Sequence, residues 1–340
     1  MRVLVTGGTG LVGSALNELN ANWTFIGSND CNLLDKEAFR QLLMSYQINS
    51  PSFSARTKAS EQTQPQSSKN TYPFDFVIHL AANVGGLFKN QAQKIKMFQD
   101  NLRINLNVIE TCYEFGIPRM ICCLSTCVFP DGLKRVMDEN DLHNGEPHYS
   151  NYGYAYAKRM IDVHCELINN NNLNFFYQTI IPTNIYGPYD QFKNPENAHV
   201  IPALICKAST TSRLGQNDLL IRGSGTPVRQ FIYSRDLAKI ITLLVERDIR
   251  INRLICSPDA QEEHSIMRVA ELIAKNFGIA RVVPELLLSN TIDDGQYTKT
   301  CTNANLRNVI PENLFQFTPL ETGIRQTCDW YKLIVEPHVS

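Results

Sequence analysis

The sequence predicts an α/β fold, a Rossmann-type doubly wound parallel sheet with a smaller, discontinuous C-terminal domain. Short apolar runs typical of buried strands alternate with helical patterns, as in successive βαβ units. The runs lie at residues 2–5, 24–26, 76–80, 120–124 and 176–181. Beyond residue 187 the pattern loosens into loops and short elements, which indicates a second domain.

The first apolar run leads directly into a glycine-rich segment. Gly7, Gly10 and Gly13 precede a helical pattern that continues through Leu16. Glycines at this spacing permit a tight turn and a close approach of the backbone to a pyrophosphate, which the amides at a helix N-terminus then bind. The motif alone is a weak signal, but between a strand and a helix it favours a dinucleotide site over a purely structural turn.

Composition excludes several classes of protein. The 340 residues suffice for a full core shared by more than one domain. Hydrophobic residues make up 43% of the chain and the formal net charge is -1, which argues against general disorder and against bulk attraction to nucleic acid. The ten cysteines include no pair of C-x-x-C motifs, so we expect reduced thiols and no metal. Without a signal-peptide pattern or a membrane-spanning run, we expect a cytoplasmic protein that does not contact membranes.

The domain organisation follows from the same patterns. We expect a dinucleotide-binding domain at residues 1–182, to which a helical stretch within 230–250 returns. The second domain, which would bind substrate, should comprise residues 183–229 and 251–333.

One segment of the first domain differs in composition from the rest. Residues 49–72 are rich in Ser, Thr, Gln, Lys and Pro and contain few large apolar side chains, so we interpret them as a flexible insertion. The insertion follows a helical stretch and precedes the strand at 76–80. It should therefore lie at the amino ends of the parallel strands, whereas ligands bind at the carboxyl ends.

Two segments that are close in sequence combine the groups needed to reduce a ketone. Tyr154 and Lys158 are four residues apart in a helical pattern, so they share one face, and we expect the ammonium to lower the pKa of the phenol. Ser125 offers a hydroxyl that would hydrogen-bond the same carbonyl oxygen. Cys127, two residues further along an extended chain, adds a thiol that can act as an acid or a base. The thiol favours epimerisation in addition to reduction.

Taken together, these segments resemble the extended short-chain dehydrogenase/reductases and, within them, the GDP-L-fucose synthases. The broader resemblance rests on the glycine motif, on the serine that precedes Tyr154-x-x-x-Lys158, and on RQFIYSRD at 229–236. The narrower resemblance rests on VGGLF at 84–88, LSTC at 124–127, HNG at 143–145, PTNIYGP at 182–188, AHVIP at 198–202 and DG at 294–295. It covers nearly the whole chain apart from residues 49–72.

The resemblance implies a role for each catalytic residue. Tyr154 would donate a proton to the C4 oxygen of a keto-sugar, Lys158 would lower the phenol's pKa and hold the nicotinamide ribose, and Ser125 would hydrogen-bond the C4 oxygen. Cys127 and His199 would form the epimerisation pair. The implied reaction converts GDP-4-keto-6-deoxy-D-mannose to GDP-L-fucose by inversion at C3 and C5 and hydride transfer to C4, in a homodimer.

The resemblance also implies NADP(H) as the cofactor. A carboxylate directly after the second strand would favour NAD, but Ile26 is followed by Gly27, Ser28 and Asn29, and Asp30 comes late. Ser28 and Asn29 are candidate donors to a 2'-phosphate. The implied cofactor-binding residues are Gly7, Gly8, Thr9, Gly10, Leu11, Val12, Gly13, Leu80, Ala81, Ala82, Cys123, Leu124, Ser125, Thr126, Lys158, Pro182, Thr183, Asn184, Ile185 and His199.

Four further residues are implied to bind substrate. Lys207 and Arg229 resemble the contacts to the nucleotide diphosphate, which suits the forked guanidinium of arginine. Asp294 resembles another substrate-binding position. Arg222 stands where these enzymes commonly have tryptophan, so its contact with substrate departs from the pattern.

Alternatives remain open at this stage. Cys127 follows an apolar strand, where a lone thiol is more often an inert core residue, and His199 could cap or pack a loop. Arg229 could pair with Asp236 at the surface. A nucleotide-sugar dehydratase or an NAD-dependent 4-epimerase is a second class of enzyme on this fold, although dehydratases generally place Asp-Glu where this chain has Cys127-Val128. A cofactor-sensing protein without chemistry is a third class.

Overall fold

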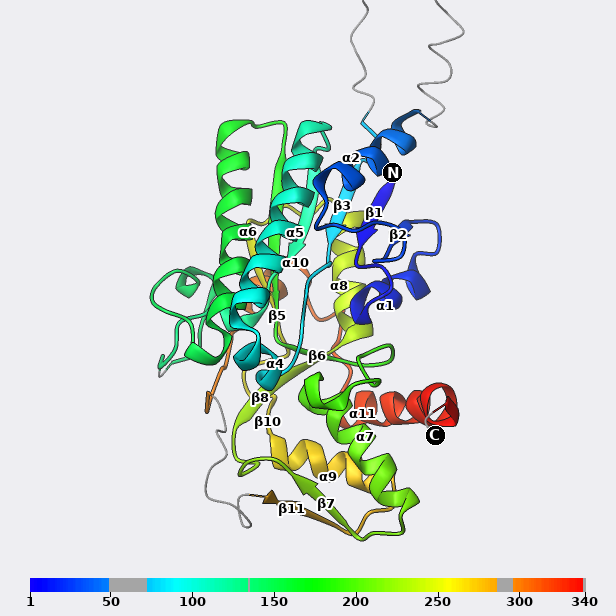
Figure 1. The fold of residues 1–340 in the computed structure, drawn as a ribbon. Coiled ribbons are helices and arrows are strands. Elements are labelled where there is room, and N and C mark those ends of the chain that lie inside the picture. Colours follow the sequence, from blue (N-terminus) through cyan, green and yellow to red (C-terminus); the bar gives the residue numbers. More distant parts are fainter. Residues whose placement is uncertain (49–71, 134, 286–295, 339–340) are drawn as a thin grey trace, which may run out of the picture.

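The computed structural model describes residues 1–48, 72–133, 135–285 and 296–338 (Figure 1). Its strands are β1 (Val3–Thr6), β2 (Thr24–Ile26), β3 (Phe76–His79), β4 (Arg119–Cys123), β5 (Phe176–Pro182), β6 (Asn184–Tyr186), β7 (Asp218–Ile221), β8 (Val228–Tyr233), β9 (Arg253–Cys256), β10 (Glu263–Ser265) and β11 (Arg281–Pro284). Its α-helices are α1 (Leu11–Leu19), α2 (Lys36–Ile48), α4 (Leu87–Ala92), α5 (Lys94–Glu114), α6 (Tyr152–Asn171), α7 (Val200–Arg213), α8 (Ser234–Glu246), α9 (Ile266–Asn276), α10 (Ala304–Val309) and α11 (Leu320–Trp330). Shorter helical turns are η1 (Thr126–Val128), η2 (Glu139–Asp141), η3 (Tyr149–Asn151), η4 (Pro195–Asn197), the π-helical η6 (Tyr331–Val335) and η7 (Glu336–His338).

The larger domain is built on a six-stranded sheet with the order β2-β1-β3-β4-β5-β9, in which every neighbouring pair is parallel. The expected α/β fold with a doubly wound parallel sheet is therefore confirmed. Successive side chains of β1 enter opposite layers: Leu4 packs with α2, α5 and α6, whereas Val3 and Val5 pack with α1 and α8. Burial on both faces explains why these strands read as continuous apolar runs in the sequence.

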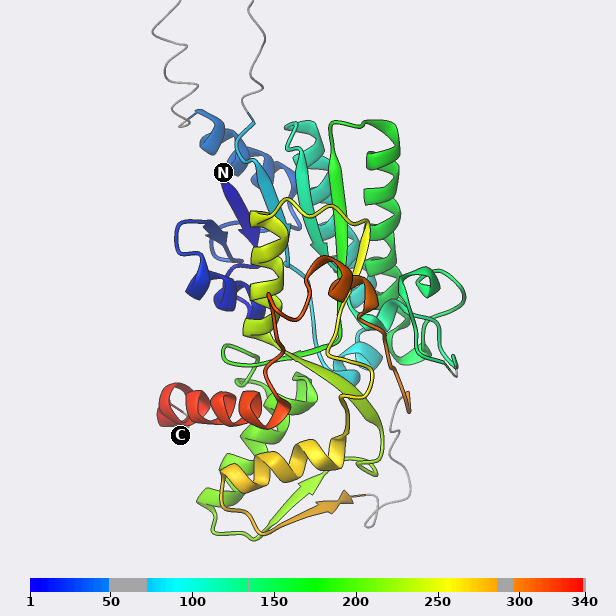
Figure 2. The ribbon, with the colours of Figure 1, turned by 180° about the vertical axis from the view of Figure 1, so that it is seen from behind.

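The smaller domain lies below the carboxyl ends of the large sheet (Figures 1 and 2). A three-stranded sheet with the order β10-β8-β6 and a parallel pair of β11 and β7 form its strands. Helices α7, α9 and α11 bury their apolar faces together in a separate core, which includes Ile205, Ile273 and Ile324. This core gives the second domain its own stability.

The expected domain boundary at residue 251 needs a correction. Strand β9 pairs in parallel with β5 and forms the edge of the large sheet, with Ile181 opposite Ile255. Leu306 and Ile310 of α10, together with Phe315, join the core between that sheet and α8. The chain therefore returns twice to the first domain after residue 230. The first return continues from α8 through β9, beyond the expected boundary, and the second, at α10 and Phe315, was not expected.

The insertion expected at 49–72 lies outside the described residues, apart from Tyr72. Tyr72 lies at the amino ends of the parallel strands, as expected. Its carbonyl accepts a hydrogen bond from the guanidinium of Arg2, one residue before β1. Among the described helices, none is both long and apolar enough to cross a membrane.

Candidate active site

A cavity of about 1190 Å³ opens at the carboxyl ends of the large sheet, and both domains contribute to its walls. All five residues predicted to be catalytic line it, although they come from the loop after β4, from α6 and from the start of α7. So do Lys207, Arg222 and Arg229 from the second domain, while Asp294 lies outside the described residues. The fold therefore brings together most of the predicted site.

The glycine-rich loop forms the part of this cavity that fits a dinucleotide. Gly7 has a φ of +72°, and a Cβ at Gly13 would lie 2.3 Å from the Gly7 carbonyl oxygen, so the turn excludes side chains at both positions. The N-cap of α1 is Gly10, and no side chain caps the helix, so the first amides remain available for a phosphate. Gly8 differs from its predicted role because it does not line the cavity. Its amide donates to the Ile26 carbonyl and its Cα lies against β2.

Lys158 and Tyr154 project from successive turns of α6. The Lys158 ammonium donates to the Cys123 carbonyl over 2.8 Å and lies 5.9 Å from the centre of the Tyr154 ring. Burial lowers the pKa of Lys158 and raises the pKa of Tyr154 well above its ordinary value, with the Cys127 and Cys123 thiols acting in the same direction on the phenol. The predicted lowering of the phenol's pKa is thus wrong. Desolvation dominates and favours the protonated phenol.

Ser125 and Cys127 are held by a short turn that follows β4. The Ser125 hydroxyl caps η1 by accepting from the Cys127 amide over 3.5 Å. Cys127 is 8% exposed. Burial raises the pKa of its thiol, whereas Lys299, Ser125 and Lys158 act to lower it.

Lys299 is a cavity residue that the sequence analysis missed. It interacts electrostatically with Cys127, and burial together with Arg229 lowers the pKa of the ammonium. A cation at this place stabilises the thiolate form of Cys127, which is the form that can remove a proton. Lys299 is more than 170 positions from Cys127 and has no local motif, so only the folded chain could reveal it.

His199 is the N-cap residue of α7 and lines the cavity. Its side chain makes no capping hydrogen bond. The alternative of a simple capping histidine is therefore not supported, and the imidazole remains available to a ligand. Asp190, another cavity residue that sequence reasoning missed, interacts electrostatically with His199.

The second-domain cations make contacts with other groups around the cavity. Lys207 pairs with Glu285 at 2.7 Å, and Arg222 pairs with Glu196 at 2.7 Å. Arg229 donates to backbone carbonyls, including that of Tyr297 at 3.1 Å, rather than to Asp236. An incoming diphosphate could recruit Lys207 and Arg229, because each lies at the cavity surface with a guanidinium or ammonium donor.

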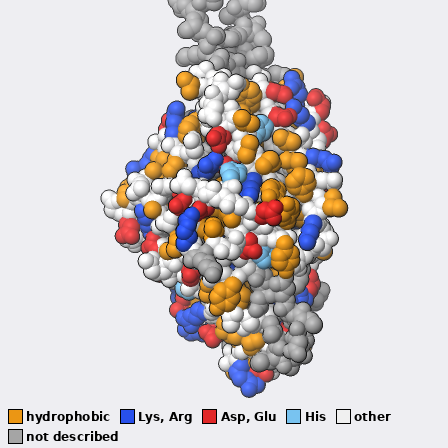
Figure 3. Space-filling model, turned by 90° about the vertical axis from the view of Figure 1, so that its left-hand side faces the viewer, with side chains coloured by type: hydrophobic (Ala, Val, Ile, Leu, Met, Phe, Trp, Pro, Cys, Tyr) orange, Lys and Arg blue, Asp and Glu red, His pale blue; other side chains and the backbone are white. Residues whose placement is uncertain are grey.

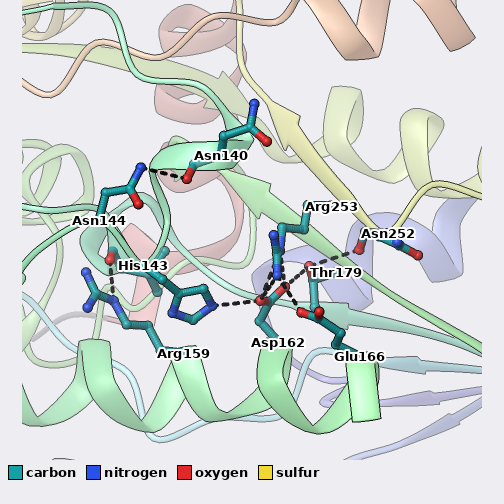
Figure 4. A network of polar contacts seen from close by, with 10 residues as sticks. Asn140, His143, Asn144, Arg159, Asp162, Glu166, Thr179, Asn252 and Arg253 are labelled. Carbon is teal, nitrogen blue, oxygen red and sulfur yellow. Dashed lines mark hydrogen bonds and ion pairs between the residues drawn. The ribbon is translucent and has the colours of Figure 1, made fainter. Parts of the chain in front are cut away.

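A buried polar network anchors the middle of α6 (Figure 4). Asp162, one turn beyond Lys158, accepts from the Arg253 guanidinium at 2.9 Å and lies 2.9 Å from the His143 imidazole. The Thr179 hydroxyl of β5 donates to the same carboxylate over 3.2 Å. These contacts join α6 to β5 and β9, and so fix the helix that carries the Tyr154 phenol.

Comparison with known proteins gives a consistent result. The family model for the NAD dependent epimerase/dehydratase family matches residues 3–253. The chain belongs to this family. A Dictyostelium discoideum protein named GDP-L-fucose synthase is 39% identical over 97% of this chain and 94% of its own length. A Drosophila melanogaster protein named probable GDP-L-fucose synthase is also 39% identical, over 97% of each chain.

A solved structure supports the same grouping. The GDP-L-fucose synthetase of Naegleria fowleri, bound to NADP, superposes with a TM-score of 0.82 at 36% sequence identity. The match covers 98% of this chain and 93% of the Naegleria chain. The chain is therefore an enzyme of this family that uses NADP.

Proposed function

We propose that this chain converts GDP-4-keto-6-deoxy-D-mannose to GDP-L-fucose with NADPH, as a 3,5-epimerase and 4-reductase. The observation that carries the proposal is the placement of Cys127 and His199 in the same cavity as Ser125, Tyr154 and Lys158. A reductase alone needs only the last three. The names of the relatives at 39% identity support the same reaction.

Epimerisation follows from the acidity that a C4 ketone gives to the hydrogens at C3 and C5. Cys127, as a thiolate assisted by Lys299, removes such a proton, while Ser125 and Tyr154 hydrogen-bond the oxygen on which the enolate charge develops. His199 then delivers a proton to the same carbon from the opposite face, which inverts the centre.

Reduction uses the same oxygen-binding groups. NADPH, when bound, supplies a hydride to C4. Tyr154 transfers its phenolic proton to the C4 oxygen as the alkoxide forms, and its raised pKa suits this role because the proton is present at neutral pH. Lys158 lies beside the ring and offsets the charge that the phenolate then carries.

The glycine loop and the residues that follow β2 support the proposal that the enzyme binds NADPH. Thr9, Leu11 and Ser28 line the same cavity as the catalytic groups. The Asp30 carboxylate accepts from the Gly27 amide over 2.7 Å, so it is engaged in a local turn. A turn that occupies its carboxylate in this way is compatible with a 2'-phosphate near Ser28.

One incubation tests the reaction. Purified protein, NADPH and GDP-4-keto-6-deoxy-D-mannose should give GDP-L-fucose, identified by NMR, with one NADPH oxidised for each product formed. Without NADPH in heavy water, the keto-sugar should gain deuterium at C3 and C5. A dehydratase or 4-epimerase would give neither result, and a cofactor-sensing protein would oxidise no NADPH.

We also propose that the enzyme is a cytoplasmic homodimer. All ten cysteines are free thiols, as expected in a reducing compartment. Apolar side chains on the outer faces of α5 and α6 are exposed, and Figure 3 shows hydrophobic side chains on this side of the molecule. They are Ile95, Phe98 and Leu106 on α5, and Met160, Val163 and Leu167 on α6. A second copy that packs its own α5 and α6 against these residues would cover them.

A further inference from the structure

Asp190 is held by a strained segment of backbone at the edge of the cavity. Tyr189 has a φ of +68°, which is unfavourable for an aromatic residue. The Tyr189 and Phe192 rings both pack on Trp330 of α11, with ring centres 4.9 and 5.9 Å apart respectively. Strain of this kind persists only where the surroundings enforce it, and it is typical of functional segments.

Only one of the two carboxylate oxygens of Asp190 has a hydrogen-bond partner among the described residues. Its Oδ1 accepts from the Gln191 amide over 2.7 Å. Its Oδ2 is buried and has no hydrogen-bond partner among the described residues. A buried carboxylate oxygen without a donor is costly, so this atom needs a partner that is supplied when the enzyme works.

Among the described residues, two titratable side chains interact with Asp190, and both come from α7 or its N-cap. Burial raises the pKa of the Asp190 carboxyl, and His199 acts in the opposite direction. The Cys206 thiol interacts with the carboxylate unfavourably. Cys206 donates to the Phe192 carbonyl over 3.3 Å and is thereby engaged. The imidazole of His199 lines the same cavity, can donate an N–H and interacts electrostatically with Asp190.

We propose that Asp190 is a positioning residue for His199, an inference that rests on the proposed function. The unpartnered Oδ2 of Asp190 accepts one imidazole N–H and so selects the orientation in which the other ring nitrogen points at the sugar. The structure shows no hydrogen bond between these two side chains, and catalytic hydrogen bonds commonly tighten only in the complex with substrate. Asp190 itself does not touch the reacting atoms.

The pair accounts for the proton that His199 must deliver. Protonated His199 gives the N–H proton that faces the sugar to C3 or C5, and the bond from carbon to hydrogen forms as the enolate reverts to the ketone. The ring becomes neutral and keeps its second N–H on Asp190. Water then restores the lost proton to the ring, which Asp190 holds through its other N–H.

The test compares Asp190→Asn with the wild-type enzyme. Asparagine keeps the size of the side chain and removes the charge. We expect product formation to fall by about tenfold or more, with KM for the keto-sugar and NADPH affinity nearly unchanged, because only proton delivery is impaired. Circular dichroism verifies the fold, and Asp190→Glu should restore part of the rate if asparagine fails through loss of charge.

A double-mutant cycle separates positioning from a general structural role. In a His199→Gln background, Asp190→Asn should cost nothing further, because the residue through which it acts is already absent. Independent, multiplicative losses would overturn the proposal, and so would a wild-type rate for Asp190→Asn. If the wild-type protein itself forms no GDP-L-fucose, the proposed function fails instead.

Discussion

Tyr154 and phenylalanine differ by a single hydroxyl, so Tyr154→Phe isolates the proton donor of the reduction. The ring still packs beside Lys158, and the cavity keeps its shape. NADPH affinity should therefore be retained while turnover falls by ~10²-fold or more, the scale of a lost general acid. Stopped-flow oxidation of NADPH measures the loss. Near wild-type oxidation in the presence of keto-sugar would refute the assignment.

Lys158 is expected to behave differently from Tyr154. Lys158 is 2% exposed and its ammonium donates to the Cys123 carbonyl, so Lys158→Met removes an anchor between α6 and β4 together with the proposed cofactor contact. Turnover and NADPH affinity should fall together. Fluorescence titration of NADPH distinguishes this result from that of Tyr154→Phe.

Lys299 offers a test of how Cys127 becomes a base. Burial raises the pKa of the thiol and Lys299 acts to lower it, so Lys299→Met should raise that pKa further and leave less thiolate at neutral pH. Deuterium exchange into the keto-sugar should slow by roughly tenfold at pH 7 and recover as the pH rises.

The control for this prediction is Lys299→Arg, which keeps the charge and should keep most of the exchange. If Lys299→Met exchanges deuterium at the wild-type rate at every pH from 6 to 9, the ammonium has no part in activating Cys127. Hydride transfer should be less affected than exchange, since Ser125 and Tyr154 remain.

At the scale of elements, strand β3 is joined to the helices beside it by a buried histidine. The His79 Nδ1 lies 2.8 Å from the Thr6 hydroxyl and its Nε2 lies 3.2 Å from the Asn105 amide oxygen. The Asn105 amide nitrogen donates to the Ala157 carbonyl of α6, which places the amide oxygen towards the ring. His79 is thus neutral with the proton on Nε2.

This histidine should make the fold sensitive to acid. Burial, together with Lys158, lowers the pKa of His79 to about 3, whereas the unfolded chain has a pKa of about 6.5. The unfolded state therefore binds the proton first, and stability is lost as the pH falls below about 6.5. Between pH 7 and pH 5 the contribution is about 2 kcal/mol.

Urea unfolding at the two pH values measures this contribution. His79→Gln, which can still make both hydrogen bonds, should lose about 2 kcal/mol less than the wild type over the same interval. Equal losses in the two proteins would mean that His79 does not carry the acid sensitivity.

The elements also show which parts of the fold could be read from the sequence. Strands β1, β3, β4 and β5 are buried on both faces, so each appears in the sequence as a short apolar run. Strand β9 joins the sheet edge through its pairing with β5, far away in the chain. Its place depends on tertiary pairing, which local pattern does not encode.

The candidate site likewise contains residues that local motifs reveal and residues that only the folded chain brings to the cavity. Ser125, Cys127 and Tyr154 occur in local motifs and were predicted from residue type and spacing. Lys299 and Asp190 reach the cavity only through folding, one from a loop of the second domain and the other through the strained turn at Tyr189. The pKa of Tyr154 was predicted in the wrong direction because burial, which dominates it, is a property of the folded protein.

At the scale of the whole molecule, the cavity depends on two domains that share one chain. The glycine loop and Tyr154 belong to the large sheet, whereas Lys207 and Arg229 belong to the small domain. Helix α8 connects the two, since it follows β8 of the small sheet and packs on α1 of the large domain. A nucleotide-sugar that contacts both domains is thereby placed against the catalytic groups.

The outer face of α5 and α6 gives the last prediction, which concerns assembly. Met160, Val163 and Leu167 recur at spacings of three and four residues on α6, and Leu167 is 62% exposed, so they form one stripe along the helix. Wild-type protein should have about twice the monomer mass of 38.5 kDa in solution. Leu167→Glu would place a charge within the stripe of each subunit and should shift the mass to that of the monomer.

Leu214→Glu, at a position on the small domain that is 66% exposed, is the matched control and should leave the dimer intact. Light scattering after size-exclusion chromatography measures all three proteins. A monomeric wild type, or a Leu167→Glu dimer of unchanged stability on dilution, would show that these helices do not form the interface.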